Sequence, residues 1–288
     1  MPKSIGVLFV ATEVEPFVKT GILANLAGNL PRTVKMMGHD IRVILPGYSF
    51  INDRRFQIHN LLRMQDIEIP VAGKMERANI KSSYLKGDTH KVQVYFISND
   101  RYFNREGLYY HPDTKKYFTD NDERFIFFCR GVLETLKRLQ WQPKIIHCND
   151  WQCGLIPMYL KTLYKDDPYL KNIRTIFTAY SLASYGAFPK TSIDKTGVPK
   201  ELYHNGSDQT ERLNFLQTGL AYADVITTMG TKADNGICRT PLDELDNILQ
   251  TRKNDVVSMR NESPNGYCHE TVAQKFLTVY RDLAKISR

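Results

Sequence analysis

The sequence has few features of secreted, metal-binding or membrane proteins. Its five cysteines form no CxxC pair, which argues against a zinc site and a disulfide framework. No apolar run approaches the roughly 20 residues of a membrane-spanning helix, and the N-terminus enters a strand-like run instead of a signal peptide. The HExxH, GxSxG and GxxxxGK(S/T) motifs are absent, which excludes the commonest metalloproteases, hydrolases and NTPases. We therefore expect a cytoplasmic protein with no metal and no cofactor.

The charge balance allows an anionic partner without choosing one. The formal net charge is +8, which suits nucleic acid, a sugar nucleotide or an acidic protein. Basic residues are spread over the whole chain and are interleaved with acids, and no aromatic RNA-binding signature or recognition-helix motif is present. This distribution disfavours nucleic acid as the partner.

Strand-like and helix-like segments alternate over most of the chain. Apolar runs without alternation are typical of strands buried on both faces of a parallel sheet. The strands are predicted at residues 5–11, 41–45, 144–148, 174–178 and 224–228, and the helices at 23–37, 120–139, 153–164 and 210–223. This order predicts an α/β fold with a doubly wound, largely parallel, Rossmann-like sheet.

Three segments depart from that alternation. Residues 56–97 contain short alternating runs divided by glycines, which predict an added region of antiparallel β-hairpins. Residues 229–266 are polar and offer one short amphipathic helix, so we expect a bridge there and no second core. Residues 267–288 repeat apolar side chains at helical spacing and predict a C-terminal helix that docks on the domain formed by residues 1–228. The short helix of the bridge is predicted from its apolar residues Leu242, Leu245, Ile248 and Leu249.

The turn after the first strand is the first candidate for chemistry. Ligands of open parallel sheets bind beyond the carboxyl ends of the strands, where a helix N-terminus attracts anions. In this turn Lys19 supplies a charge, Gly21 permits close backbone approach, and Glu13 is placed to orient the lysine or a sugar hydroxyl. The alternative is a plain loop with a solvated lysine, because a single KTG is a weak motif.

Two later turns are weaker candidates. In HCNDWQ, residues 147–152, Asp150 is predicted either to cap the next helix or to bind a ligand, and Trp151 either to pack or to bind. The turn at residues 178–186 contains hydroxyls and rings but no assembly of acid, base or nucleophile. It gives no argument for catalysis by itself.

Taken together, these turns and their spacing resemble the N-terminal half of the bacterial glycogen synthase and plant starch synthase family. The resemblance rests on residues 7–21, 30–32, 38–48, 147–157 and 219–228. It implies one lobe of a GT-B glycosyltransferase, with ADP-glucose between two Rossmann-like lobes and metal-free transfer of glucose to the non-reducing end of an α-1,4-glucan. By the same likeness, Lys19 and Gly21 approach the diphosphate, Glu13 contributes to substrate binding, and Asp150 and Trp151 shape the acceptor and glucose side.

The chain also departs from the family pattern. Where the family has K-x-G-G-L-A-D, this chain has Ile22 in place of the second glycine and Asn25 in place of the aspartate. A β-branched residue is costly if that backbone needs a positive φ. At the third turn the family has a histidine that contacts glucose, and this chain has Ala179 and Tyr180. The family continues after its A-D-x-I-T-T strand into a donor domain, and no sequence of that length follows Thr228.

The resemblance therefore predicts a family member without its donor domain and with impaired catalysis. The partners that it implies are ADP-glucose or ADP, an α-glucan, and a second copy or another protein on the exposed half of the cleft. One alternative is a non-catalytic module that binds glucan or nucleotide, or that pairs with an active synthase. Another is a binder of nucleic acid or other anions that uses the basic charge.

Overall fold

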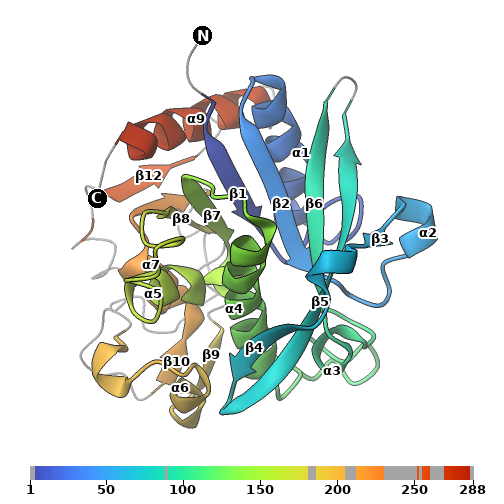
Figure 1. Ribbon diagram of the computed structural model, residues 1–288, viewed down its shortest axis with the longest axis vertical. Coiled ribbons are helices and arrows are strands. Elements are labelled where there is room, and N and C mark those ends of the chain that lie inside the picture. The colour runs from blue at the N-terminus through green and yellow to red at the C-terminus, as the bar shows by residue number, and fades with distance from the viewer. Residues whose placement is uncertain are drawn as a thin grey trace, which may run out of the picture.

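A largely parallel sheet with β1 near its middle organises the fold (Figure 1). The computed structural model describes residues 4–87, 90–180, 186–204, 212–229, 252, 255–259 and 269–285. The strand order is β12-β11-β8-β7-β1-β2-β6-β5-β3. The bounds of the strands from β12 to β2 in this order are Val256–Ser258, Val225–Thr228, Arg174–Ala179, Ile145–Asn149, Gly6–Val10 and Asp40–Pro46. The predicted doubly wound α/β sheet is confirmed.

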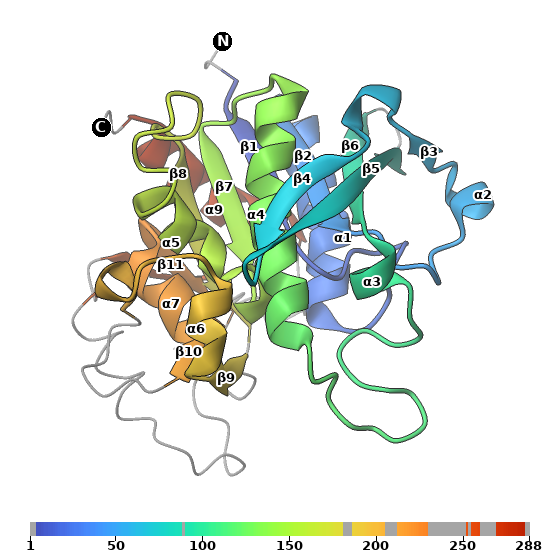
Figure 2. The same ribbon diagram turned by 60° about the horizontal axis from the view of Figure 1, so that its bottom comes forward.

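Helices cover both faces of this sheet. Strand β1 explains why, because its residues from Val7 to Val10 are fully buried and need apolar partners above and below. Figures 1 and 2 show α1 and α9 on one face and α4, α5 and α7 on the other. These helices are Ile22–Met36, His269–Lys285, Asn121–Leu139, Leu155–Lys161 and Phe215–Tyr222.

The predicted antiparallel region is confirmed, and it extends the main sheet. Strand β6 (Lys91–Ser98) pairs parallel with β2, and β5 (Lys74–Lys86) then pairs antiparallel with β6. Strands β3 (His59–Asn60) and β4 (Ile67–Val71) both pair antiparallel with β5. Short elements flank or separate these strands: α2 (Asp53–Phe56) precedes β3, the 3-10 turn η1 (Leu62–Met64) lies between β3 and β4, and α3 (Asp100–Phe103) follows β6.

The predicted helix at residues 210–223 is wrong in its first part. The chain forms β10 (Arg212–Asn214) there, antiparallel to β9 (Ala187–Pro189), and α7 begins only at Phe215. Asn214 sets this boundary, because its side chain accepts a hydrogen bond from the N–H of Gln217 at 3.1 Å. Two short elements, α6 (Thr191–Lys195) and η3 (Lys200–Leu202), precede the hairpin's second strand.

The predictions for the C-terminal part have three outcomes. The helix predicted near Leu242 and Leu249 lies outside the described residues. The prediction missed β12, which pairs parallel with β11, because three residues in a polar segment give no periodicity. Helix α9 packs on α1 and reaches the sheet, where the Tyr280 hydroxyl lies 2.7 Å from Nδ1 of His147. The docked C-terminal helix is therefore observed.

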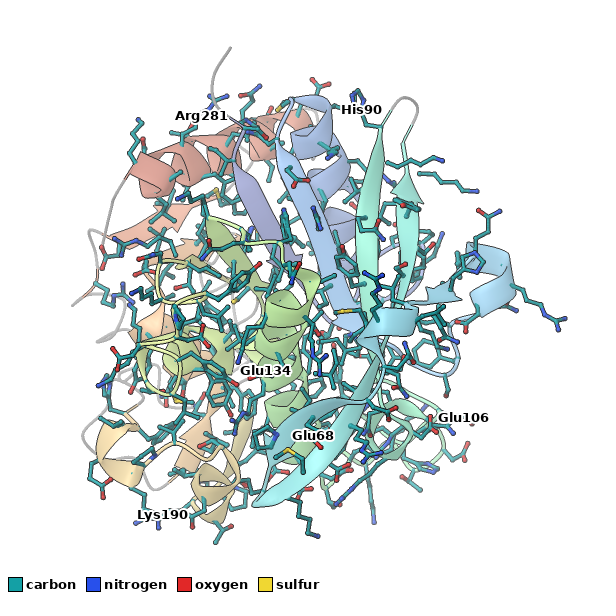
Figure 3. The ribbon with its side chains drawn as sticks, viewed as in Figure 1. Glu68, His90, Glu106, Glu134, Lys190 and Arg281 are labelled. Carbon is teal, nitrogen blue, oxygen red and sulfur yellow. The ribbon has the colours of Figure 1, made fainter. Side chains whose placement is uncertain are left out.

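Charged side chains project around the whole periphery of the molecule (Figure 3). The labelled Glu68, Lys190 and Arg281 come from β4, the start of α6 and α9, and all three are exposed. Among the described helices, none is both long enough and apolar enough to cross a bilayer.

Candidate functional site

A pocket of about 270 Å³ lies where the carboxyl ends of β1, β7 and β8 meet the N-terminus of α1. This is the edge at which parallel sheets bind ligands. It brings together residues from the first, second and third predicted turns. Its lining, which we call the carboxylate pocket, consists of Glu13, Thr20, Gly21, Ile22, Leu23, Asp150, Tyr180 and Met229.

Glu13 is the most closely held of the polar residues in this pocket. Thr20 and Tyr109 donate hydrogen bonds to its two carboxylate oxygens, and the hydroxyl of Thr12 lies 2.8 Å from that of Tyr109. Burial raises the pKa of Glu13, and the hydrogen bond from Tyr109 opposes this shift. The carboxyl group is therefore fixed in orientation, with its negative form partly compensated by hydroxyl donors.

Tyr109 and Arg124 are residues that the sequence reasoning missed. Tyr109 reaches Glu13 from the long segment between α3 and α4, and Arg124 of α4 holds that segment in place. The fully buried guanidinium of Arg124 donates to the carbonyl of Tyr102 at 2.8 Å and to that of Leu108 at 2.9 Å. The available signal was a charged residue directly before the apolar run that begins at Phe125.

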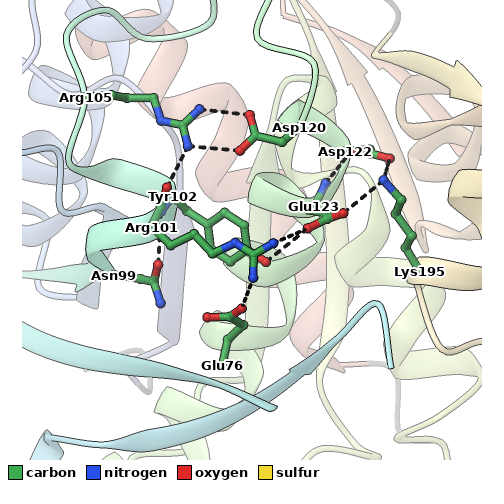
Figure 4. Close-up of polar contacts among 9 residues, drawn as sticks. All are labelled: Glu76, Asn99, Arg101, Tyr102, Arg105, Asp120, Asp122, Glu123 and Lys195. Carbon is green, nitrogen blue, oxygen red and sulfur yellow. Dashed lines mark hydrogen bonds and ion pairs between the residues drawn. The ribbon is translucent and has the colours of Figure 1, made fainter. Parts of the chain in front are cut away.

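Ion pairs at the start of α4 hold the same segment from outside (Figure 4). Arg105 donates to both carboxylate oxygens of Asp120, at 2.8 and 2.9 Å. In the first turn of α4, Asp122 and Glu123 contact Lys195 of α6 at 2.8 Å and 3.1 Å. The bidentate pair is the strongest geometry of this type, so the segment that carries Tyr109 is anchored at its end.

Asp150 supplies the second carboxyl group of the pocket. It has a φ of 64° at the turn after β7, and its own N–H donates to the carbonyl of Thr178 at 2.9 Å. Its Oδ1 accepts a hydrogen bond from the N–H of Trp151 at 2.9 Å, which is the predicted capping role. Burial raises the pKa of Asp150 to about 7. Near neutral pH this carboxyl group therefore exists in both protonation states.

Trp151 is a packing residue in this structure and does not line the pocket. Its side chain, in the 3-10 turn η2 (Trp151–Cys153), is only 3% exposed. It is surrounded by rings, with Phe125 edge-on at 5.1 Å and Phe215 edge-on at 5.9 Å. Gly186 approaches the ring so closely that an added Cβ would lie 2.1 Å from it. Of its two predicted roles, the geometry fits packing.

Lys19 and Asn25 also lie outside the pocket lining. The ammonium of Lys19 pairs with Glu15 at 2.9 Å, and its side chain is 63% exposed. Asn25 donates to the same carboxylate at 3.4 Å. The structure therefore brings Gly21 to the pocket but not the lysine that was predicted to act with it.

The backbone at Ile22 does not need a positive φ, which was the condition for strain at this position. Gly21 caps α1 with an extended φ of −178°, and Ile22 is the first residue of the helix. Helical backbone has a negative φ, which an isoleucine adopts without strain. Its side chain is 72% exposed at the margin of the pocket.

The third turn contributes a hydroxyl to the site. Ala179 ends β8 and is buried, whereas Tyr180 lines the pocket and donates to Oδ1 of Asn149 at 3.1 Å. Residues 181–185, where the rest of this predicted turn falls, are outside the described part of the chain.

The pocket lining suits a ligand that is rich in hydroxyl groups. It combines two carboxyl groups and one phenol, and it contains no lysine or arginine among the described residues. Carboxylates accept hydrogen bonds from ligand hydroxyls and repel anions. No group of three or more His, Cys, Asp or Glu side chains in the described segments is arranged to hold a metal ion.

Comparison with known proteins assigns the chain to a family. Residues 6–251 match the family described as the starch synthase catalytic domain. The chain belongs to this family. A glycogen synthase from Chlorobium luteolum is 40% identical over 226 residues, which cover 78% of this chain and 46% of that protein. A second one, from Desulforudis audaxviator, is 37% identical over 272 residues, or 90% of this chain and 51% of that protein.

A solved structure of a starch synthase has the same fold. The catalytic domain of starch synthase IV from Arabidopsis thaliana, bound to ADP and acarbose, aligns with a TM-score of 0.75 and 21% identity. The alignment covers 90% of this chain and 52% of that structure. This member of the starch synthase family thus has the α/β architecture of one GT-B lobe, and it spans about half the length of the relatives that it matches.

Proposed function

We propose that this chain binds a glucosyl unit in the carboxylate pocket and does not transfer glucose by itself. One observation carries the proposal: Glu13 and Asp150 line the same pocket at the carboxyl edge of the sheet, and its described lining contains no lysine or arginine. The reaction of which it would form one half is the transfer of glucose from ADP-glucose to the non-reducing end of an α-1,4-glucan.

The chemistry of the pocket favours the sugar over the diphosphate. A neutral sugar hydroxyl donates to Glu13 and either donates to or accepts from Asp150, whose pKa is raised to about 7. A diphosphate would meet two acidic groups, and only the N-terminus of α1 would favour it. Lys19, the nearest cation of that turn, is paired with Glu15.

Transfer requires charges that the described lining does not supply. Each preorganised donor to a developing negative charge lowers a barrier by about 3–4 kcal/mol. We infer that another structural unit, for example a partner protein or a second copy of this chain, covers the pocket and brings cations to the leaving ADP. The exposed side chain of Ile22 at the pocket margin fits such a covered position.

Two measurements test the proposal. The chain alone, given ADP-glucose labelled in the sugar and glycogen, should incorporate no label above a blank. Titration calorimetry with maltose should show binding that Asp150→Asn weakens about tenfold, the effect of one lost hydrogen bond to a charged group. Asp113→Asn, at an exposed carboxylate outside the pocket, should leave binding unchanged.

Opposite results would separate the parts of the proposal. Incorporation of label by the chain alone, abolished by Lys19→Ala, would overturn the claim that it does not transfer glucose. The pocket would be assigned to the nucleotide instead if Lys19→Ala abolished the binding of ADP and Asp150→Asn left the affinity for maltose unchanged.

A further inference from the structure

A second and larger hollow lies along the same edge of the sheet. Its volume is about 590 Å³, within the roughly 300–1,000 Å³ of small-molecule sites. Loops that follow β2 and β6 meet α2, β3 and β5 there, on one side of the molecule in Figure 1. Because β1 and β2 are neighbours, this hollow continues the edge that carries the carboxylate pocket. We call it the amide pocket, after the lining residues Asn52, Asn60, Gln65, Asn79, Asn99 and Asn104.

We propose that the amide pocket binds a neutral oligosaccharide, as a holding site for glucan separate from the carboxylate pocket. Its charges argue for a neutral ligand. Asp53 and Lys81 neutralise each other at 2.7 Å, which leaves Asp100 as the carboxylate without an ion pair in the described lining. An anion would find no unpaired cation in that lining, and a cation would find a single carboxylate.

Three of the amides are fixed by the backbone. Oδ1 of Asn52 accepts from Arg55 N–H at 2.8 Å, that of Asn79 from Asp66 N–H at 2.9 Å, and that of Asn99 from Tyr102 N–H at 3.0 Å. These bonds hold the side chains in one orientation before any ligand arrives. Such preorganisation lowers the entropy that binding must overcome.

Several other amide groups of the lining make no hydrogen bond to a described residue. The side chains of Asn60 and Asn104 make no hydrogen bond to described residues, and neither does the amide NH₂ of Asn52 or Asn79. An amide offers both donors and an acceptor. A sugar hydroxyl also donates and accepts, so a polyhydroxylated ligand uses both kinds of group at once.

The floor of the amide pocket is apolar. The buried rings of Tyr48 and Phe96 and the side chains of Ile51 and Ile58 line it. Small-molecule sites combine apolar side chains with polar groups that fix the orientation of the ligand. Sugar rings match this arrangement, because they carry C–H faces between their hydroxyls.

Calorimetry with maltoheptaose tests the inference, whose choice of an α-glucan rests on the proposed function. The double variant Asn60→Ala/Asn104→Ala should weaken binding at one site about tenfold, since two hydrogen bonds are lost. Asn172→Ala, at an exposed asparagine outside both pockets, should not. Hydrogen exchange should show protection by maltoheptaose in residues 47–53 and 98–104.

The test of the amide pocket does not depend on ligand binding at the carboxylate pocket. In Asp150→Asn, the protection of residues 47–53 should persist even if maltose binding at the first pocket fails. Maltoheptaose binding that is the same in wild type and the double variant would overturn the inference. Protection restricted to residues 13–22 would overturn it as well.

Discussion

Two of the turns that form the carboxylate pocket differ in how firmly the fold holds them. In the turn after β1, Lys19 and Ile22 are exposed, and the lysine is held only by a surface ion pair. In the turn after β7, Trp151 and Cys153 are buried, and Asp150 is bonded to β8 and to its own helix. One wall of the pocket is therefore set by the core, and the other combines the buried Glu13 with residues 19–22, which are exposed to solvent.

This difference separates two consequences of substitution. A change in the buried wall disturbs packing, and its cost follows from cavity formation and lost hydrogen bonds. A change in the exposed wall leaves the core intact and alters only what a ligand meets, because an exposed pair such as Lys19–Glu15 contributes at most about 1 kcal/mol.

The largest expected effect is on the buried wall. Trp151→Ala should lower the free energy of unfolding by about 3–5 kcal/mol, because the indole fills a space enclosed by aromatic rings. Denaturation in urea measures this change. Tyr84→Ala, at a half-exposed ring of β5, is the control and should cost less than about 1 kcal/mol. A stable Trp151→Ala protein that no longer binds maltose would instead give Trp151 a direct ligand contact.

The same contrast explains what the sequence could predict. Apolar runs located β1, β7 and β8, and their shared carboxyl edge located the pocket, because both follow from burial and chain direction. Where the side chains point did not follow from the pattern. Lys19 turns to Glu15, four residues earlier, and Trp151 turns to rings that come from distant elements.

The residues that were missed show the limit most clearly. Tyr109 reaches Glu13 across 96 positions of sequence, and no local motif links the two. The amide pocket likewise draws its lining from segments between residues 47 and 104. Its asparagines are ordinary turn residues in the sequence, and only the folded chain brings them together.

A smaller effect is expected from the protonation of Asp150. Its pKa is raised to about 7 in the folded chain, from an ordinary value of 3.8, so the folded state holds the proton more tightly. The stabilisation is fully present below about pH 4 and is lost as the pH rises through 7. Unfolding free energies measured from pH 4.5 to 8 should therefore fall less steeply in Asp150→Asn than in the wild type. Parallel curves for the two proteins would contradict this assignment.

The smallest effect on stability is expected at Ile22, on the exposed wall. Ile22→Gly should lower the free energy of unfolding by at most about 1 kcal/mol, the helix-propensity cost of glycine, because the lost side chain is mostly in solvent. The same change should tighten maltose binding, since it removes atoms from the pocket margin. Ile22→Ala separates the two causes, because alanine removes most of the side chain and keeps the helix propensity. If Ile22→Ala binds maltose no better than the wild type while Ile22→Gly does, backbone freedom at the start of α1, and not side-chain volume, limits access to the pocket.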